Sequence, residues 1–333
     1  MYRPNSVCIA SLLGAVLAVI LPARAQEPYQ FESDLMANRR LFDSVGAGFR
    51  AIRRGPNGNY YILTAPAPAV LIYDAEGKRV RQIPSESAAA KGAALVYGES
   101  LDVDREGRVA VCDRGTNTVR IYAPNGSLTT RISVPEPISV VFLTGGEIAV
   151  ASPTGDHLIT AYDLAGNVVR DFGDREEIAD QAVLNSQVNF GILAADGAGN
   201  TYFAFDYLPE PTVRKFDHAG YLAMEISLTT LEFQPAAQAA RKAIARSETG
   251  IPSLHRIISA IGVDPQTLDV WLAIGTLLMH FDKDGQRIAS FRTFAPGGVR
   301  LEPAVIVVEP DRLLIGADPQ GIYEFPKPAK LPQ

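Results

Sequence analysis

Residues 100–132, SLDVDREGRVAVCDRGTNTVRIYAPNGSLTTRI, decide the fold of this chain. The stretch contains four short segments rich in β-branched and small apolar residues, each ended by a turn. The predicted strands are 101–103, 108–112, 118–122 and 127–132, and Pro124-Asn125-Gly126 has the composition of a hairpin turn. Four antiparallel strands in about 35 residues form a sheet too small to bury both of its faces, so it needs copies of itself.

Two features of this stretch recur along the chain. The first is a turn with glycine or polar residues after an innermost strand, at 56–59, 105–108, 144–147, 197–200, 264–267 and 309–312. The second is an aromatic residue followed by an acid-rich turn, at Tyr73, Tyr122, Tyr162, Phe216 and Phe281, with a truncated copy at Tyr323. A near-constant distance between the two features indicates one repeated sheet unit. Six units predict an all-β, six-bladed β-propeller of four-stranded antiparallel blades.

The two ends of the chain predict how the ring closes. The sixth copy stops after its third strand, because Pro326, Pro328 and Pro332 cannot donate to a fourth strand. Residues 38–45 precede the first copy and have a strand pattern. We therefore expect an N-terminal strand to complete the last blade, with 38–333 as the propeller and 26–37 as a lead-in.

The copies resemble the NHL-repeat family of propellers, of the type exported by bacteria. The clearest match is at 101–126, where a glycine turn, a strand ending in Asp113, a small polar loop, a β-branched strand, Tyr122 and Gly126 follow the family pattern. The resemblance covers residues 38–326 and weakens towards the C-terminus. The WD40 signature is absent, since Trp271 is the only tryptophan.

Residues 1–25 have the pattern of a secretory signal peptide. Arg3 precedes an apolar run at 8–21, and Ala23-Arg24-Ala25 is an A-x-A cleavage site. We expect cleavage after Ala25 and a secreted or periplasmic protein, the alternative being an uncleaved membrane anchor. No later apolar stretch is long enough to span a bilayer.

The charge of the mature chain limits its partners. Loss of Arg3 and Arg24 leaves 29 basic and 37 acidic residues, a net charge of −8. An acidic surface without a Lys/Arg run argues against nucleic acid or an anionic membrane as the partner.

Two long links between blades predict helices over one face of the ring. Residues 174–177 have capping-box spacing and begin a helix-like run to Leu184. The longest link, 229–256, contains an alanine-rich helical segment at 235–246. Both links emerge on the face that carries the loops between second and third strands, where they would form a partial lid.

The candidate ligand-binding residues come from the same face. They are Asp113, Arg114, Asn117, Asp156, His157, Asp206, Tyr207 and His255. For Asp113 there is a structural alternative, because in the NHL family an Asp at this place organises its loop by bonding backbone amides. This interpretation makes the chain a binding or scaffold module for an unidentified protein or small molecule, acting through its lidded face without a cofactor.

The alternative is a metal-dependent hydrolase. Propellers that resemble this chain include gluconolactonase-like hydrolases, with a divalent cation held by Glu, Asn and Asp, and amidating lyases, with a histidine-bound zinc. Neither ligand set can be matched residue by residue, and the four histidines are not spaced as a local metal pair. First-strand positions expected to face the channel are apolar, which favours binding over lactone or ester hydrolysis: Ile52, Leu101, Val103, Val140, Leu193, Ile261 and Val305.

Overall fold

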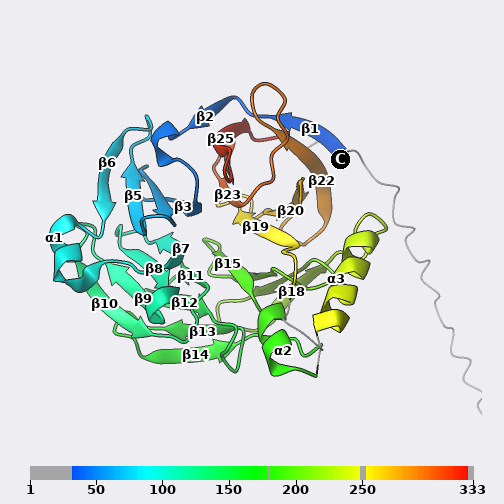
Figure 1. Ribbon diagram of the computed structural model, residues 1–333, viewed down its shortest axis with the longest axis horizontal. Coiled ribbons are helices and arrows are strands. Elements are labelled where there is room, and N and C mark those ends of the chain that lie inside the picture. The colour runs from blue at the N-terminus through cyan, green and yellow to red at the C-terminus, as the bar shows by residue number, and fades with distance from the viewer. Residues whose placement is uncertain (1–31, 179, 248–252, 329–333) are drawn as a thin grey trace, which may run out of the picture. The chain divides into compact units, whose positions relative to one another are not determined.

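The described residues of the chain form a six-bladed β-propeller (Figure 1). The computed structural model describes residues 32–178, 180–247 and 253–328, so the expected signal peptide lies outside it. Within these ranges, no helix has both the length and the apolar character needed to cross a membrane.

Each blade is an antiparallel sheet whose first strand lines the central channel. Blades 1 to 3 consist of β3 (Phe49–Arg54), β4 (Tyr60–Thr64), β5 (Ala69–Tyr73) and β6 (Arg79–Ile83); β7 (Gly98–Val103), β8 (Val109–Asp113), β9 (Thr118–Tyr122) and β10 (Leu128–Ser133); and β11 (Ser139–Phe142), β12 (Ile148–Ala151), β13 (Ile159–Tyr162) and β14 (Val168–Phe172). Blades 4 to 6 consist of β15 (Gly191–Ala195), β16 (Thr201–Phe205), β17 (Thr212–Phe216) and β18 (Leu222–Ser227); β19 (Ile258–Val263), β20 (Val270–Ile274), β21 (Leu277–Phe281) and β22 (Arg287–Phe294); and β23 (Val305–Val308), β24 (Arg312–Ala317) and β25 (Gly321–Pro326).

The N-terminal residues close the ring with two strands. Strand β2 (Arg39–Leu41) pairs antiparallel with β25 and completes blade 6, which confirms the predicted closure. Strand β1 (Glu32–Met36) pairs parallel with β22 as a fifth strand of blade 5, and the sequence did not predict it. A parallel partner lies far away in the sequence and leaves no hairpin turn to detect.

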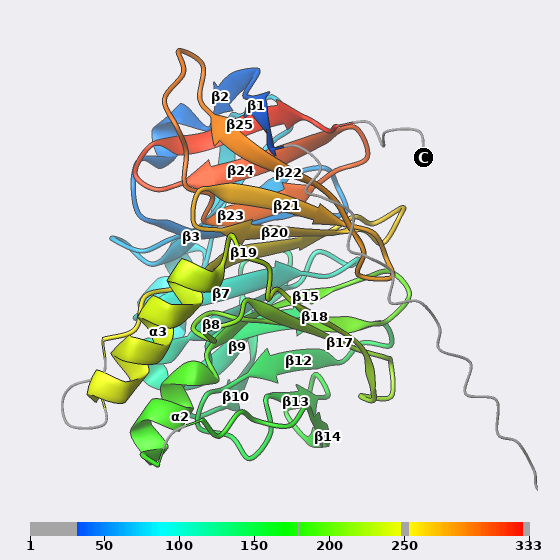
Figure 2. The ribbon, with the colours of Figure 1, turned by 90° about the vertical axis from the view of Figure 1, so that its right-hand side faces the viewer.

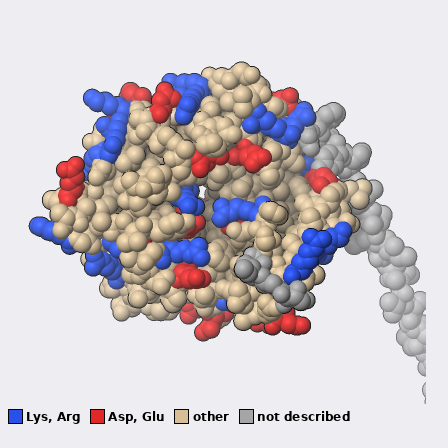
Figure 3. Space-filling model, viewed as in Figure 1, with Lys and Arg blue, Asp and Glu red and all other residues tan. Residues whose placement is uncertain are grey.

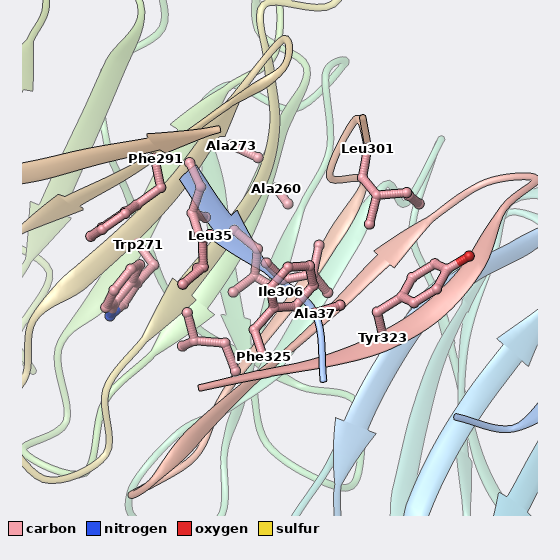
Figure 4. Packing of buried hydrophobic residues seen from close by; sticks show 14 of the residues in the cluster. Leu35, Ala37, Ala260, Trp271, Ala273, Phe291, Leu301, Ile306, Tyr323 and Phe325 are labelled. Carbon is pink, nitrogen blue, oxygen red and sulfur yellow. The ribbon is translucent and has the colours of Figure 1, made fainter. Parts of the chain in front are cut away.

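A buried apolar cluster joins blades 5 and 6 to this N-terminal segment (Figure 4). Leu35 of β1 lies in the same cluster as Trp271 and Phe291 of blade 5 and Phe325 of blade 6. Trp271 and Phe325 are fully buried. The N-terminal segment therefore contributes apolar side chains to the core of the ring as well as backbone hydrogen bonds.

The recurring turn features have a structural explanation in two contacts. Asp104 Oδ1 accepts hydrogen bonds from the N–H groups of Glu106 (3.0 Å) and Arg108 (2.8 Å), which shapes the turn between first and second strands. In the outer turn of blade 4, Gly220 has a φ of +94°, and a Cβ there would lie 2.9 Å from the side chain of Phe172 in blade 3. The repeated glycine thus allows each blade to pack on the preceding one.

Two helices lie on one face of the ring, as expected (Figure 2). Helix α3 (Gln234–Ser247) covers the segment predicted from its alanine content. Helix α2 spans Ala182–Val188. It begins later than predicted, so the prediction of a capping box at 174–177 was wrong. The N–H of Glu176 instead donates to Asn189 Oδ1 (2.8 Å), and the Glu176 carboxylate pairs with Arg214, so this segment bonds other parts of the chain. The short helix α1 (Glu86–Ala88) lies in the link between blades 1 and 2.

Candidate functional site

The central channel has a cavity at each end. The smaller one, about 100 Å³, opens on the face of α2 and α3, and we call it the helix-side mouth. The helices stand beside the opening rather than across it (Figure 1). Charged side chains gather around the opening on this face (Figure 3). The side chains that matter most in its lining are Arg50, Glu99, Phe190, Asp206 and Arg256.

Asp206 is the most deeply buried charged group of this mouth. It follows β16, and its own N–H donates to the carbonyl oxygen of Phe190 (3.0 Å). The residue is only 2% exposed, and its Oδ2 lies 2.8 Å from Nη2 of Arg256. Its other oxygen, Oδ1, is buried and has no hydrogen-bond partner among the described residues.

Glu99, on the first strand of blade 2 (β7), has a similar arrangement. Its Oε1 lies 4.0 Å from Nη1 of Arg50, whose Nη2 donates to the hydroxyl of Tyr97 (2.7 Å). Its Oε2 is buried and, within the described part of the chain, also lacks a partner. Buried acceptors without a donor are rare and unfavourable, so two in one small cavity point to a site that a bound molecule completes.

The pKa of Asp206 is perturbed. Burial raises the pKa of this carboxyl to about 7, and the negative charge of Glu99 adds to the effect. The guanidinium of Arg256 acts in the opposite direction and does not cancel it. The carboxyl therefore changes its protonation near neutral pH and can donate as well as accept a hydrogen bond.

Asp113 and Asn117 bond neighbouring links between blades. Asp113 is fully buried, accepts hydrogen bonds from the N–H groups of Val96 (3.2 Å) and Tyr97 (2.8 Å), and pairs with Arg120 at 2.8 Å. Asn117 has a φ of +51°, and its side chain accepts a hydrogen bond from the backbone of the next link. For Asp113, these contacts correspond to the structural alternative rather than to ligand binding.

Arg114 and Tyr207 meet at Phe190, which lines the helix-side mouth. The guanidinium of Arg114 lies 5.2 Å from the centre of the Phe190 ring, and Tyr207 contacts the same ring edge-on at 6.1 Å. The remaining predicted residues, Asp156, His157 and His255, are exposed and line neither cavity.

The expected apolar lining of the channel is correct in part, since Val103, Ile261 and Val305 each line one of the two cavities or both. Four of its members are fully buried between blades and line neither cavity: Ile52, Leu101, Val140 and Leu193. The physical reason is that both faces of an innermost strand are covered by adjacent blades. Polar groups also lie in the channel: Asp102 accepts hydrogen bonds from Arg53 Nε (3.1 Å) and from the N–H of Phe142 (2.7 Å), which links three blades.

The donor set of a cation-dependent hydrolase is not assembled here. Within residues 32–178, 180–247 and 253–328, no three or more His, Cys, Asp or Glu side chains lie close enough together to hold a metal ion. The side-chain amide of Asn189 bonds the backbone of Glu176 and Asn185.

Comparison with known proteins finds similarity at the level of structure. No family model and no curated protein matches the chain. A streptogramin B lyase is similar with a TM-score of 0.55 and 12% identity over 85% of this chain and 84% of the lyase. A catalytically inactive virginiamycin B lyase from Staphylococcus aureus with quinupristin gives 0.54 and 12% over 87% and 98%. A Bacteroides fragilis protein described as exported gives 0.56 and 14% over 86% and 83%. Similarity at these identities shows the shared fold.

Proposed function

We propose that this chain is an exported, NHL-like propeller that binds a small uncharged ligand at its helix-side mouth, without chemistry of its own. The observation that carries the proposal is the pair of buried, unpartnered oxygens, Glu99 Oε2 and Asp206 Oδ1. Glu99 Oε2 needs a hydrogen-bond donor, and Asp206 Oδ1 needs a donor when the carboxyl is ionised and can itself donate when it is protonated. Arg50 and Arg256 already offset the two negative charges, so the ligand supplies N–H or O–H groups rather than a positive charge.

The surroundings of the mouth support a ligand with both polar and apolar surface. Phe190 and Tyr207 are half-buried aromatic residues in contact with each other, and Tyr97 is exposed beside Arg50. Aromatic rings with a polar edge suit ligands whose hydroxyl or amide groups lie next to C–H surface. A neutral sugar or a short peptide amide has this character.

Export and family assignment rest on the sequence. The pattern of residues 1–25 supports a secretory leader, and the spacing of the turn and aromatic features supports an NHL-like repeat. The similarity in fold to a protein described as exported is consistent with this assignment.

Calorimetric titration of the chain from Gln26 onward with neutral monosaccharides and small amides tests the proposal. At least one of these should bind saturably, while acetate and ethylammonium should not. The Glu99→Gln/Asp206→Asn double variant should weaken binding at least tenfold, since a hydrogen bond to a charged group contributes about 1.5–3 kcal/mol. Asp156→Asn, an exposed change on the same face, is the matched control. Tighter binding of acetate or ethylammonium than of the neutral compounds contradicts the proposal, and so does unchanged binding by the double variant.

A further inference from the structure

The opposite end of the channel has a much larger cavity, which we call the funnel. Its volume is about 830 Å³, within the range of about 300–1,000 Å³ that small-molecule sites occupy. The turns between first and second strands surround it, so it opens on the face away from α2 and α3. None of the predicted site residues lines it.

The wall of the funnel is apolar and incompletely buried. Five successive blades each contribute at least one half-buried apolar side chain to it, including Val103, Phe142, Ala195, Val263 and Val307. Partly exposed apolar groups around a concave surface are favourable contacts for an apolar ligand, because binding removes them from water.

The buried acids of the funnel already have their hydrogen-bond donors, in contrast to those of the helix-side mouth. Both oxygens of Asp102 accept hydrogen bonds. Asp196 accepts from the N–H groups of Ala198 and Asn200, and from the hydroxyl of Tyr202 (3.0 Å). A ligand therefore gains free energy at this wall from apolar contacts rather than from donating hydrogen bonds to the acids.

One cation at the rim has no counter-charge. Arg105 is exposed, lines the funnel and forms no ion pair among the described residues. Its neighbours are paired: Arg108 with Asp104, and Arg54 with Glu309 at 3.2 Å. Arg105 can therefore meet an anionic group that enters the funnel from solvent.

We infer that the funnel is a second binding site, which takes a small amphiphile with an aliphatic chain and an acidic head. The chain lies among the five apolar side chains, and the head lies beside Arg105 at the rim. The site is separate from the helix-side mouth because the Arg53–Asp102 ion pair stands in the channel between them, where Arg53 lines both cavities.

Titration of the chain from Gln26 onward with octanoate and with 1-octanol tests this inference. Both should bind saturably. Ala195→Asp places a charge in the wall and should weaken the binding of octanoate and of 1-octanol by at least tenfold. Arg105→Ala should weaken octanoate two- to fivefold and leave 1-octanol unchanged, as expected for an exposed ion pair.

Asp206→Asn at the helix-side mouth is the control. It should change neither the affinity for octanoate nor that for 1-octanol, so this test is independent of the ligand proposed at that mouth. Val263→Thr, which keeps the shape of the wall and replaces one methyl group by a hydroxyl, should weaken the binding of both ligands by about two- to fivefold and is the second variant if Ala195→Asp fails to fold. Absence of saturable octanoate binding, unchanged affinity in both wall variants, or dependence of the affinity on Asp206 overturns the inference.

Discussion

Replacing Arg312 by methionine is expected to lower the free energy of unfolding by about 1.5–3 kcal/mol, because it removes a charge-assisted hydrogen bond to the buried carboxylate of Glu309, which keeps Arg54 as its other cationic partner. Arg312 donates from Nε to Glu309 Oε2 (2.7 Å) and from Nη2 to the hydroxyl of Tyr60 (2.6 Å). The side chain of Glu309 is only 3% exposed. Burial and the neighbouring Glu309 raise the pKa of Tyr60 to about 12, so its hydroxyl stays protonated and donates to Glu309 at 2.6 Å.

This network joins the last blade to the first. Glu309 and Arg312 belong to blade 6, Tyr60 belongs to blade 1, and Glu324 of β25 accepts from both Arg312 and Arg39 of the closing strand. Loss of Arg312 therefore weakens the seam at which the ring closes.

Urea unfolding of matched variants measures the effect. Arg292→Met removes an ion pair with Asp34 (2.7 Å) in which both side chains are about half exposed, and should cost about 1 kcal/mol or less. Adding Glu309→Gln to Arg312→Met should recover part of the loss, since it removes the buried negative charge that has lost one of its two arginine partners. If Arg312→Met and Arg292→Met lower the free energy of unfolding equally, the hydrogen bonds of Arg312 stabilise the protein no more than an exposed ion pair does.

The contribution of Asp206 to the free energy of unfolding is expected to fall as the pH rises from about 4 to about 8, by an amount on the order of 4 kcal/mol. The pKa of this carboxyl is raised from 3.8 to about 7 in the folded protein. Below pH 4 both the folded and the unfolded chain hold the proton. Between these values the folded chain holds a proton that the unfolded chain has lost, so the contribution of Asp206 decreases as the pH increases and is lost above about 7.

The comparison of wild type with Asp206→Asn at pH 4.5 and pH 8 isolates this contribution. The difference in the free energy of unfolding between the two proteins should change with pH, because the asparagine does not titrate. Asp156→Asn, an exposed carboxylate on the same face, should follow the wild type at both pH values. A constant difference between wild type and Asp206→Asn would mean that Asp206 is ionised throughout.

The blades could be predicted because their signals are local. Asp104 bonds amides two and four residues ahead, and Gly220 needs a positive φ next to the preceding blade, so both leave a fixed spacing in the sequence. Strand 118–122 was predicted to its ends for the same reason.

The helix-side mouth could be predicted only in part, because its contacts are distant in the sequence. Asp206 was identified from its loop, but its partner Arg256 lies at the end of a long insertion. Glu99 precedes the segment predicted as a strand, and no local pattern marks it as buried. The partner strand of β1 is likewise some 250 residues away in the sequence, so no local sequence pattern indicates that the two strands pair.

Ring closure by β1 and β2, on which the position of every site residue depends, is tested most directly by amide hydrogen exchange. The N–H of Ala37 donates to the carbonyl of Phe294 (2.9 Å), and that of Asn38 donates to the carbonyl of Glu324 (2.7 Å). We expect both amides to exchange with an opening free energy similar to that of Leu314 in the middle of blade 6. Exchange of Ala37 and Asn38 at nearly unprotected rates, while Leu314 stays protected, would contradict closure by the N-terminal strands.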